Sequence, residues 1–205
     1  MRYLRRRARR LRVKKEIRTL GIDDSPFKLG TDRHALLVGV IYRGNMWPEG
    51  IEIRPVEVDG VDSTSAITDM IIRSKHRGQL RVVFLSGVTF AGLNLANPDQ
   101  IVKETSIPVV TVTDRKPNLD EILRAVEKTS YADIKKEILI NIGKPEEVVV
   151  GTSGKRLYIK CFGISLSSAI EVIRTTRRVS AEPEAIRVAK LFASSLPRCS
   201  ELKNL

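Results

Sequence analysis

The chain has 205 residues, of which 42% are hydrophobic and 29% charged, and its net charge is +12. A chain of this size can bury the core of one domain without a disulfide or metal to stabilise it. Its two cysteines, Cys161 and Cys199, form no CxxC pair, which argues against a structural zinc site and a disulfide framework. No apolar run reaches the ~18 residues of a membrane span, and no apolar segment typical of a secretory signal follows the charged N-terminus. We therefore expect a soluble, cytoplasmic protein with no membrane partner.

The positive charge is concentrated at the N-terminus. Residues 1–18 contain ten Lys or Arg and one Glu, whereas the rest of the chain contains 26 Lys or Arg and 23 Asp or Glu. Like charges this dense repel one another and favour a free arm, and such arms often bind nucleic acid by neutralising its phosphates. A solvated tail without a partner is the alternative. The residues of the arm that are predicted to bind nucleic acid are Arg5, Arg6, Arg7, Arg9, Arg10, Arg12, Lys14 and Lys15.

A strand that ends in two adjacent aspartates follows the arm. Side chains alternate between the two faces of a strand, so residues 17, 19 and 21 share a face with Asp23, and residues 18, 20 and 22 share one with Asp24. Pro26 has no N–H to donate, so the strand should stop after the acidic pair. A turn over residues 23–26 is the alternative, because Asp, Ser and Pro favour turns. As a strand, the segment would deliver one carboxylate to a cleft.

Two more strands are expected in quick succession. Residues 34–42 form a continuous apolar run rich in β-branched side chains, which favours a buried strand. Residues 50–58 alternate in polarity, and Pro55 favours an edge position or a bulge. Three consecutive strands with short connections suggest an antiparallel meander.

The rest of the chain alternates between strands and helices. The polar cluster at 62–65 favours the start of a helix through Ser74, and residues 80–85 form a buried strand that ends at Ser86 and Gly87. Alternation of this kind implies a parallel sheet region. We also expect a loop or short helix over 88–103, strands at 107–112, 148–150 and 157–161, and helices at 119–129, 132–142, 166–176 and 182–196.

The predicted fold is an α/β mixed sheet. A three-strand antiparallel meander precedes βα units, with helices on both faces of the sheet, which is the layout of the ribonuclease H-like fold. We expect one domain over residues 16–197. A basic arm over residues 1–15, disordered or loosely helical, would precede this domain, and a tail over residues 198–205 would follow it.

Several stretches together resemble a known family. They are LGIDDSPF (20–27), VEVDGVDSTSAITDMI (56–71), QLRVVFLSGVTFAGLNL (79–95), IPVVTVTDRKP (107–117) and EPEAIRVAKLFA (182–193). These blocks resemble, in the same order, an archaeal family called domain of unknown function 99. That family is similar to endonuclease V, a magnesium-dependent nuclease of ribonuclease H-like fold that cuts nucleic acid near deoxyinosine or inosine.

The likeness to endonuclease V lies in three places. Residues 21–23 resemble the first-strand motif that supplies a metal-binding Asp, residues 85–87 fall where endonuclease V has Asp-Gly, and the segments 163–173 and 182–189 resemble its C-terminal helical part. The chain also departs from the pattern. Ser86 stands where endonuclease V has Asp, Phe162 lies near the position of its His, and its wedge motif with a Tyr and prolines has no counterpart.

The resemblance implies a Mg²⁺ or Mn²⁺ site in which Asp23 is one ligand. Mg²⁺ is usually held by one or two carboxylates together with water and substrate phosphate. Asp59 and Asp62 are the candidates for a second ligand, although a turn at 59–60 and a helix N-cap at 62 explain these residues equally well. The Ser86 hydroxyl can hold water or phosphate without adding charge. The predicted catalytic residues are Asp23, Asp59, Asp62 and Ser86, the metal ligands are Asp23 and Asp62, and Gly87 and Asn94 are predicted to contact nucleic acid in the cleft.

These observations predict a protein that binds DNA or RNA through an endonuclease V-like domain with a weakened or lost nuclease centre. Ser86 and Phe162 carry that prediction, because neither supplies the metal ligand or base expected there. The first alternative is an active Mg²⁺-dependent endonuclease on inosine-containing or otherwise modified single-stranded DNA or RNA. The second is a small-ligand or protein-interaction domain with an incidental basic tail.

Overall fold

The computed structural model describes residues 11–151 and 154–198. Its strands are β1 (Arg18–Asp24), β2 (His34–Arg43), β3 (Trp47–Glu57), β4 (Leu80–Leu85), β5 (Thr89–Phe90), β6 (Asn94–Leu95), β7 (Val109–Thr113), β8 (Glu146–Val149) and β9 (Arg156–Phe162). Its helices are α1 (Ser63–Arg73), α2 (Pro98–Thr105), α3 (Leu119–Val126), α4 (Ala132–Ile142), α5 (Leu166–Thr176) and α6 (Glu184–Ser195). No described helix is both long and apolar enough to cross a membrane.

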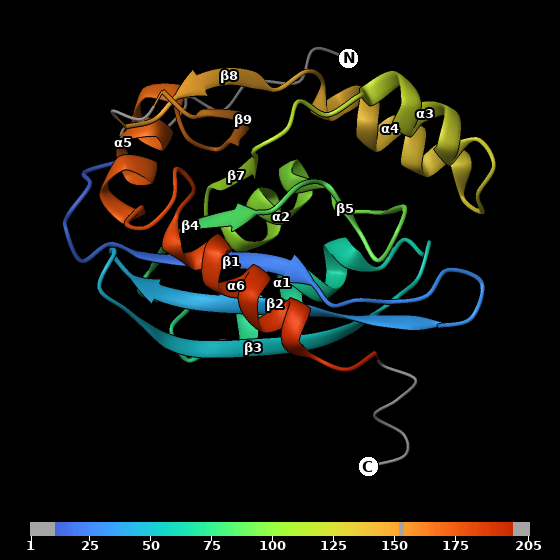
Figure 1. Cartoon of the computed structure of the whole chain (residues 1–205), viewed down its shortest axis with the longest axis horizontal. Coiled ribbons are helices and arrows are strands. Elements are labelled where there is room, and N and C mark those ends of the chain that lie inside the picture. The colour runs from blue at the N-terminus through green and yellow to red at the C-terminus, as the bar shows by residue number, and fades with distance from the viewer. Residues whose placement is uncertain (1–10, 152–153, 199–205) are drawn as a thin grey trace.

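One mixed sheet organises the molecule, with strand order β3-β2-β1-β4-β7-β9-β8 (Figure 1). The strands β1, β2 and β3 pair antiparallel, as the predicted meander requires, and β3 with Pro55 lies at the sheet edge. The strands β1, β4 and β7 run parallel. The α/β architecture predicted from the sequence is therefore confirmed.

The parallel region is shorter than the alternation of strands and helices suggests. Strand β9 runs antiparallel to β7, and β8 and β9 pair antiparallel with each other. The short connection between β8 and β9 explains their pairing, because a short loop can join only antiparallel neighbours, whereas a parallel pair needs a long crossover. The chain therefore closes this side of the sheet with a hairpin.

Helices cover both faces of the sheet. On one face α1 and α2 pack against apolar side chains that include Leu20 and Ile22 of β1. On the other face α5 and α6 pack, and α6 crosses β1 and β2 in front of the sheet in Figure 1. Gly21 permits this close crossing, because a Cβ there would lie 2.2 Å from the carbonyl carbon of Ala185 in α6. The alternation predicted for β1 is thus confirmed on both faces.

The segment 88–103 holds more structure than expected. It contains the small β5–β6 hairpin and most of α2, which begins after the N-cap Asn97 with Pro98 in its first turn. The α3–α4 pair packs on this hairpin through Leu95, Val126 and Leu139. The hairpin therefore links the α3–α4 pair to the rest of the domain.

Candidate active site at the carboxyl ends of β1 and β4

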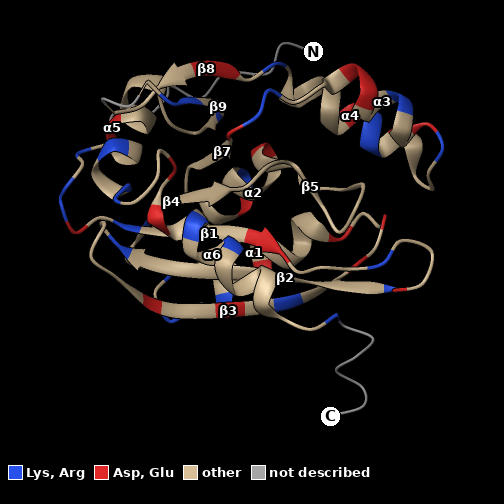
Figure 2. Ribbon diagram, viewed as in Figure 1, with Lys and Arg blue, Asp and Glu red and all other residues tan. Residues whose placement is uncertain are grey.

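The two adjacent aspartates belong to β1 and face opposite sides of the sheet. Both lie within the strand, so the turn over residues 23–26 is not formed there. Asp24 points toward the β5–β6 hairpin, where its Oδ2 accepts a hydrogen bond of 2.8 Å from the N–H of Ala91. Asp23 lies on the opposite side, which α6 covers, and Figure 2 shows the acidic end of β1 beside this helix.

Asp23 shares its surroundings with a second carboxylate, a lysine and a hydroxyl group. Burial raises the pKa of Asp23, and the charge of Glu182 raises it further, whereas hydrogen bonding by Ser86 and the charge of Lys190 lower the pKa. The Lys190 Nζ lies 2.7 Å from Glu182 Oε2. A carboxylic acid with a raised pKa beside a lysine is an arrangement typical of functional sites.

The fold brings these four groups together from three segments. Ser86 follows β4 directly, and its N–H donates a 3.1 Å hydrogen bond to the carbonyl of Ile22, which places it beside Asp23. Glu182 precedes α6, and Lys190 lies two turns into the helix. The contact of Gly21 with the start of α6 sets the helix close enough for Lys190 to approach Asp23.

Glu182 and Lys190 were not among the residues predicted from the sequence. Both lie in the stretch 182–193 that resembles the C-terminal helical segment of endonuclease V, so a signal was present. Their eight-residue separation, with one residue outside the helix, matches no helical spacing that would mark a pair. Only the packing of α6 on β1 shows that they belong beside Asp23.

The pKa of Asp24 is raised as well. Burial raises the pKa of Asp24 to about 6, and the nearby charge of Asp23 adds to the effect, while the N–H of Ala91 opposes it. Asp24 is therefore half protonated near pH 6, and its carboxylate anchors the tip of the β5–β6 hairpin.

Asp59 holds a loop in place. It has a positive φ of 55°, its N–H donates to the carbonyl of Ala91, and its Oδ1 accepts a 2.7 Å hydrogen bond from the N–H of Leu93. The buried Lys135 of α4 donates to the Asp59 carbonyl at 2.6 Å. These bonds join the end of β3 to the β5–β6 hairpin and to α4, and a catalytic role for Asp59 stays a prediction.

The half-buried Asp62 and the buried Asn94 form a second junction. Asp62 precedes α1, yet its carboxylate caps no helix N–H; it accepts from the N–H of Glu57 at 3.2 Å and from Asn94 Nδ2 at 2.6 Å. Asn94 is fully buried and also accepts from the N–H of Ser63 at 3.0 Å. Both side chains are engaged within the protein, so their predicted roles in metal and nucleic-acid binding are left without direct support.

The remaining predicted positions fall at different places. Gly87 lies at the open carboxyl end of β4, where an added Cβ would meet only Thr113 at 3.9 Å. Phe162 pairs with Val109 at the start of β7, at the end of the sheet opposite Asp23, so it does not occupy this site. Arg12, Lys14 and Lys15 precede β1 and also lie toward that opposite end. The arm residues Arg5, Arg6, Arg7, Arg9 and Arg10 lie outside the described residues.

The donor set suits one weakly held divalent ion rather than two. Within residues 11–151 and 154–198 no three His, Cys, Asp or Glu side chains converge as a metal-binding group. Asp23 can anchor one Mg²⁺ that water and phosphate complete, with Glu182 and the Ser86 hydroxyl nearby. Glu182 is already paired with Lys190, which reduces its availability to a metal. A two-metal centre needs several carboxylates to hold its ions, and no group of three or more His, Cys, Asp or Glu side chains is present among the described residues to supply them.

The fold described above matches that of solved structures. A crystal structure of Ciona intestinalis endonuclease V, in complex with a 24mer DNA containing an inosine followed by a ribo-adenosine, matches with a TM-score of 0.56 and 13% identity over 91% of this chain and 86% of that chain. A crystallised Archaeoglobus fulgidus protein matches with a TM-score of 0.76 and 33% identity over 86% of this chain and 95% of that one. The fold is thus that of endonuclease V, which confirms the predicted ribonuclease H-like architecture.

The family follows from the sequence match. The model of the endonuclease dU family matches residues 15–197, and the chain belongs to this family. A UPF0215 protein of Pyrococcus horikoshii is 40% identical over 195 residues, which cover 94% of this chain and 97% of that protein. The prediction of an archaeal family related in fold to endonuclease V is confirmed, and the description of that family is endonuclease dU.

Proposed function

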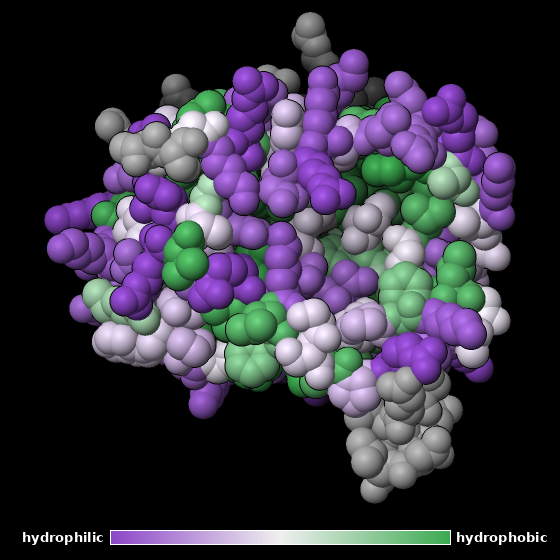
Figure 3. Space-filling model, in the orientation of Figure 1, coloured by the Kyte–Doolittle hydropathy of each residue, from purple (hydrophilic) through white to green (hydrophobic). Residues whose placement is uncertain are grey.

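We propose that this protein is an endonuclease that cuts DNA at or near deoxyuridine, with its active site at Asp23. The observation that carries the proposal is the meeting of Asp23, Glu182 and Lys190 at the carboxyl end of β1 in a chain of the endonuclease dU family. Open α/β sheets commonly bind ligands outside the carboxyl ends of their strands. Figure 3 shows a recess in this face of the molecule, between α6 and the α3–α4 pair. A cytosolic location is part of the proposal.

The residues at this edge have distinct roles in the proposal. Lys190 donates to a phosphate oxygen of the bound strand and balances its charge. Asp23 and Glu182 orient the attacking water by accepting hydrogen bonds from it, one of the two carboxylates takes its proton as the bond to phosphorus forms, and the Ser86 hydroxyl holds Asp23 in position. A Mg²⁺ or Mn²⁺ anchored by Asp23 would supply positive charge that favours attack on phosphorus and departure of the leaving oxygen.

A weakened nuclease centre on a nucleic-acid-binding domain is the second candidate. Its support is that Ser86 brings no charge, Asp62 is engaged with Asn94, and no three-residue metal group forms among the described residues. In that case the protein would hold DNA or RNA without cutting it. Binding would persist in chelator, weaken steeply with salt, and drop when residues 2–15 are deleted.

Cleavage of defined oligonucleotides tests the proposal. Purified full chain is incubated with Mg²⁺ or Mn²⁺ and single- or double-stranded DNA carrying one deoxyuridine, one deoxyinosine or neither. We expect cleavage of the deoxyuridine strand at least about tenfold faster than of the unmodified strand, and loss of cleavage by about a hundredfold or more in Asp23→Asn. Thermal unfolding of the variant confirms that it is folded.

The outcomes separate the candidates. Cleavage of the deoxyinosine strand alone would show that the substrate is deoxyinosine instead of deoxyuridine, and it would leave the proposed active site at Asp23 unchanged. Saturable binding in chelator with no cleavage above the Asp23→Asn background under any metal would refute the enzyme and favour the second candidate. Absence of both binding and cleavage would exclude both.

A further inference from the structure

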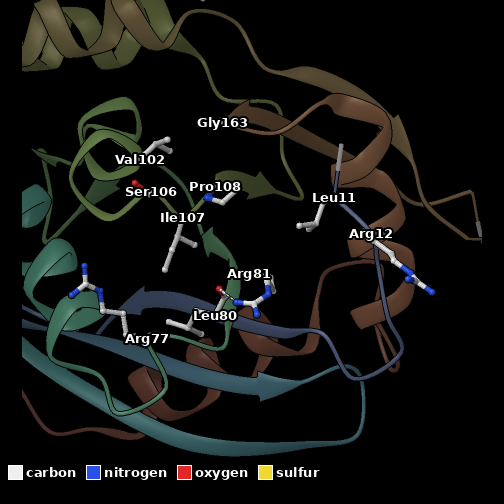
Figure 4. Close-up of a pocket in the computed structure, with 10 residues that line it drawn as sticks. All are labelled: Leu11, Arg12, Arg77, Leu80, Arg81, Val102, Ser106, Ile107, Pro108 and Gly163. Atoms are coloured by element: carbon white, nitrogen blue, oxygen red, sulfur yellow. Dashed lines mark hydrogen bonds between the residues drawn. The ribbon is translucent and has the colours of Figure 1, made fainter. Parts of the chain in front are cut away.

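A second concave site lies at the end of the sheet opposite Asp23. A cavity of about 650 Å³ opens where β4 and β7 begin, beside the end of α2 and the segment that precedes β1 (Figure 4). Leu80 is the first residue of β4, whereas Ser86 follows the last. At about 3.3 Å per residue the length of β4 puts roughly 20 Å between this cavity and the candidate active site. The two sites are therefore separate.

The cavity combines an apolar floor with an arginine rim. Leu80 and Ile107, both buried, contribute to the floor together with Val102. Arg77 follows α1 and Arg81 lies in β4, while Arg12 comes from the segment before β1. In the view of Figure 4, Arg77 and Arg12 lie on opposite sides of the cavity, with Leu80 and Arg81 between them. None of the described residues that line it is acidic.

The arginine rim is partly fixed and electrically unbalanced. Arg81 donates from one guanidinium nitrogen to the carbonyls of Gly78 and Leu80, each at 3.0 Å, which holds the side chain while the N–H groups of its other two guanidinium nitrogens remain for other partners. Neither Arg77 nor Arg12 forms an ion pair with a described acidic side chain. The rim therefore carries positive charge that is not neutralised by the described part of the protein.

A smaller cavity of about 310 Å³ adjoins the first and extends the positive charge. It shares Arg12 and Arg81 and adds Lys14, Arg18 and Glu16. Arg18 is engaged by Glu49 at 2.6 Å, and Glu16 by Arg43 at 3.5 Å, which leaves Arg12, Lys14 and Arg81 as the surplus cations. We call the two cavities together the basic pocket.

We propose that the basic pocket binds the phosphate group of a nucleotide, whose base or sugar covers the apolar floor. Guanidinium groups bind phosphate oxygens in pairs through their planar donor fork, and a volume of several hundred Å³ suits a ligand of nucleotide size. The nucleotide is either free in solution or part of a nucleic-acid strand that runs past this end of the sheet. The proposal does not depend on cleavage at Asp23.

Binding of deoxynucleotide probes to full-length variants tests the proposal. Calorimetric titration with dTMP, inorganic phosphate and a short 5′-phosphorylated oligonucleotide compares the wild type with Arg12→Gln/Arg77→Gln, two exposed arginines whose replacement disturbs no described hydrogen bond. Arg124→Gln on α3 is a matched control far from the pocket in sequence. All titrations contain chelator, so that no cleavage takes place.

We expect dTMP or the oligonucleotide to bind with an affinity that falls at least about tenfold in the double variant and stays unchanged in Arg124→Gln. A loss seen with both probes indicates that free nucleotides enter the pocket, and a loss seen only with the oligonucleotide identifies a strand as the ligand. The proposal would be overturned by binding that the double variant leaves intact, or by equal affinity for inorganic phosphate and for dTMP, since the apolar floor would then contribute nothing. Absence of binding for all three probes would also overturn it.

Discussion

Asp23 and Asp24 are neighbours in sequence that meet different surroundings. The alternation of the strand sends Asp23 to α6 and Asp24 to the β5–β6 hairpin. Asp23 meets Ser86 and Lys190, which favour its charged form, whereas Asp24 meets only backbone N–H groups and the charge of Asp23. This difference explains why Asp23 is the better candidate for catalysis and Asp24 the better candidate for a pH-dependent contribution to stability.

Replacing Asp24 by Asn should stabilise the protein at neutral pH. The pKa of Asp24 is about 6 in the folded protein and 3.8 ordinarily, so the unfolded chain loses this proton first and stability falls as the pH rises between those values. Asn cannot ionise, yet its carbonyl oxygen can still accept from the N–H of Ala91. We expect Asp24→Asn to raise the free energy of unfolding by roughly 1 to 3 kcal/mol at about pH 7.5, with no gain near pH 3.5.

Urea unfolding of both proteins in chelator, at several pH values, measures this difference. A gain of the same size at every pH would show that the carboxylate acts through its shape and not through its ionisation. An Asp24→Asn protein less stable than the wild type at about pH 7.5 would contradict the raised pKa.

At the scale of elements, strong periodicity was enough to predict most of the sheet and helices. The expected bounds 80–85, 132–142 and 166–176 coincide with β4, α4 and α5, because each has a clear apolar pattern and its own boundary signals. The β5–β6 hairpin was not predicted, because two-residue strands have no periodicity. Its position depends on bonds to distant residues, from Ala91 to Asp24 and from Asp59 to Ala91.

Adding a methyl group at Gly21 should separate α6 from β1. A Cβ at this position would lie 2.2 Å from the backbone of Ala185, and neither the strand nor the helix can move without disturbing the core. We expect Gly21→Ala to cost roughly 1 to 3 kcal/mol or more in the free energy of unfolding and to lower cleavage, because Lys190 would move from Asp23. Gly78→Ala is the matched control, since nothing lies within 4 Å of its added Cβ.

Chemical denaturation and the cleavage assay are run on both glycine variants. The interpretation of α6 as the element that positions the active site would be wrong if Gly21→Ala and Gly78→Ala were equally stable and equally active. It would be supported if only Gly21→Ala lost stability and activity together.

At the scale of the whole molecule, the sheet separates two kinds of surface. The carboxyl ends of β1 and β4 hold Asp23 and Ser86, and the opposite end holds the arginines of the basic pocket. The sequence pointed to Asp23 and Ser86 because each directly marks a strand end. It could not show Glu182 near Asp23, nor Arg12 and Arg81 lining one cavity, because only the fold brings each pair together.

The position of the active site is the central claim, and a comparison of Asp23→Asn with Asp62→Asn tests it most directly. Asp62 is the alternative acidic candidate, but its carboxylate holds the junction with Asn94. Rates of cleavage of deoxyuridine-containing DNA are measured under single-turnover conditions well below the unfolding temperature of each variant. We expect Asp23→Asn to lose about a hundredfold or more in rate while being at least as stable as the wild type, and Asp62→Asn to lose about 1 kcal/mol of stability with a rate within about tenfold of the wild type. Cleavage that survives Asp23→Asn and is abolished by Asp62→Asn would contradict the account.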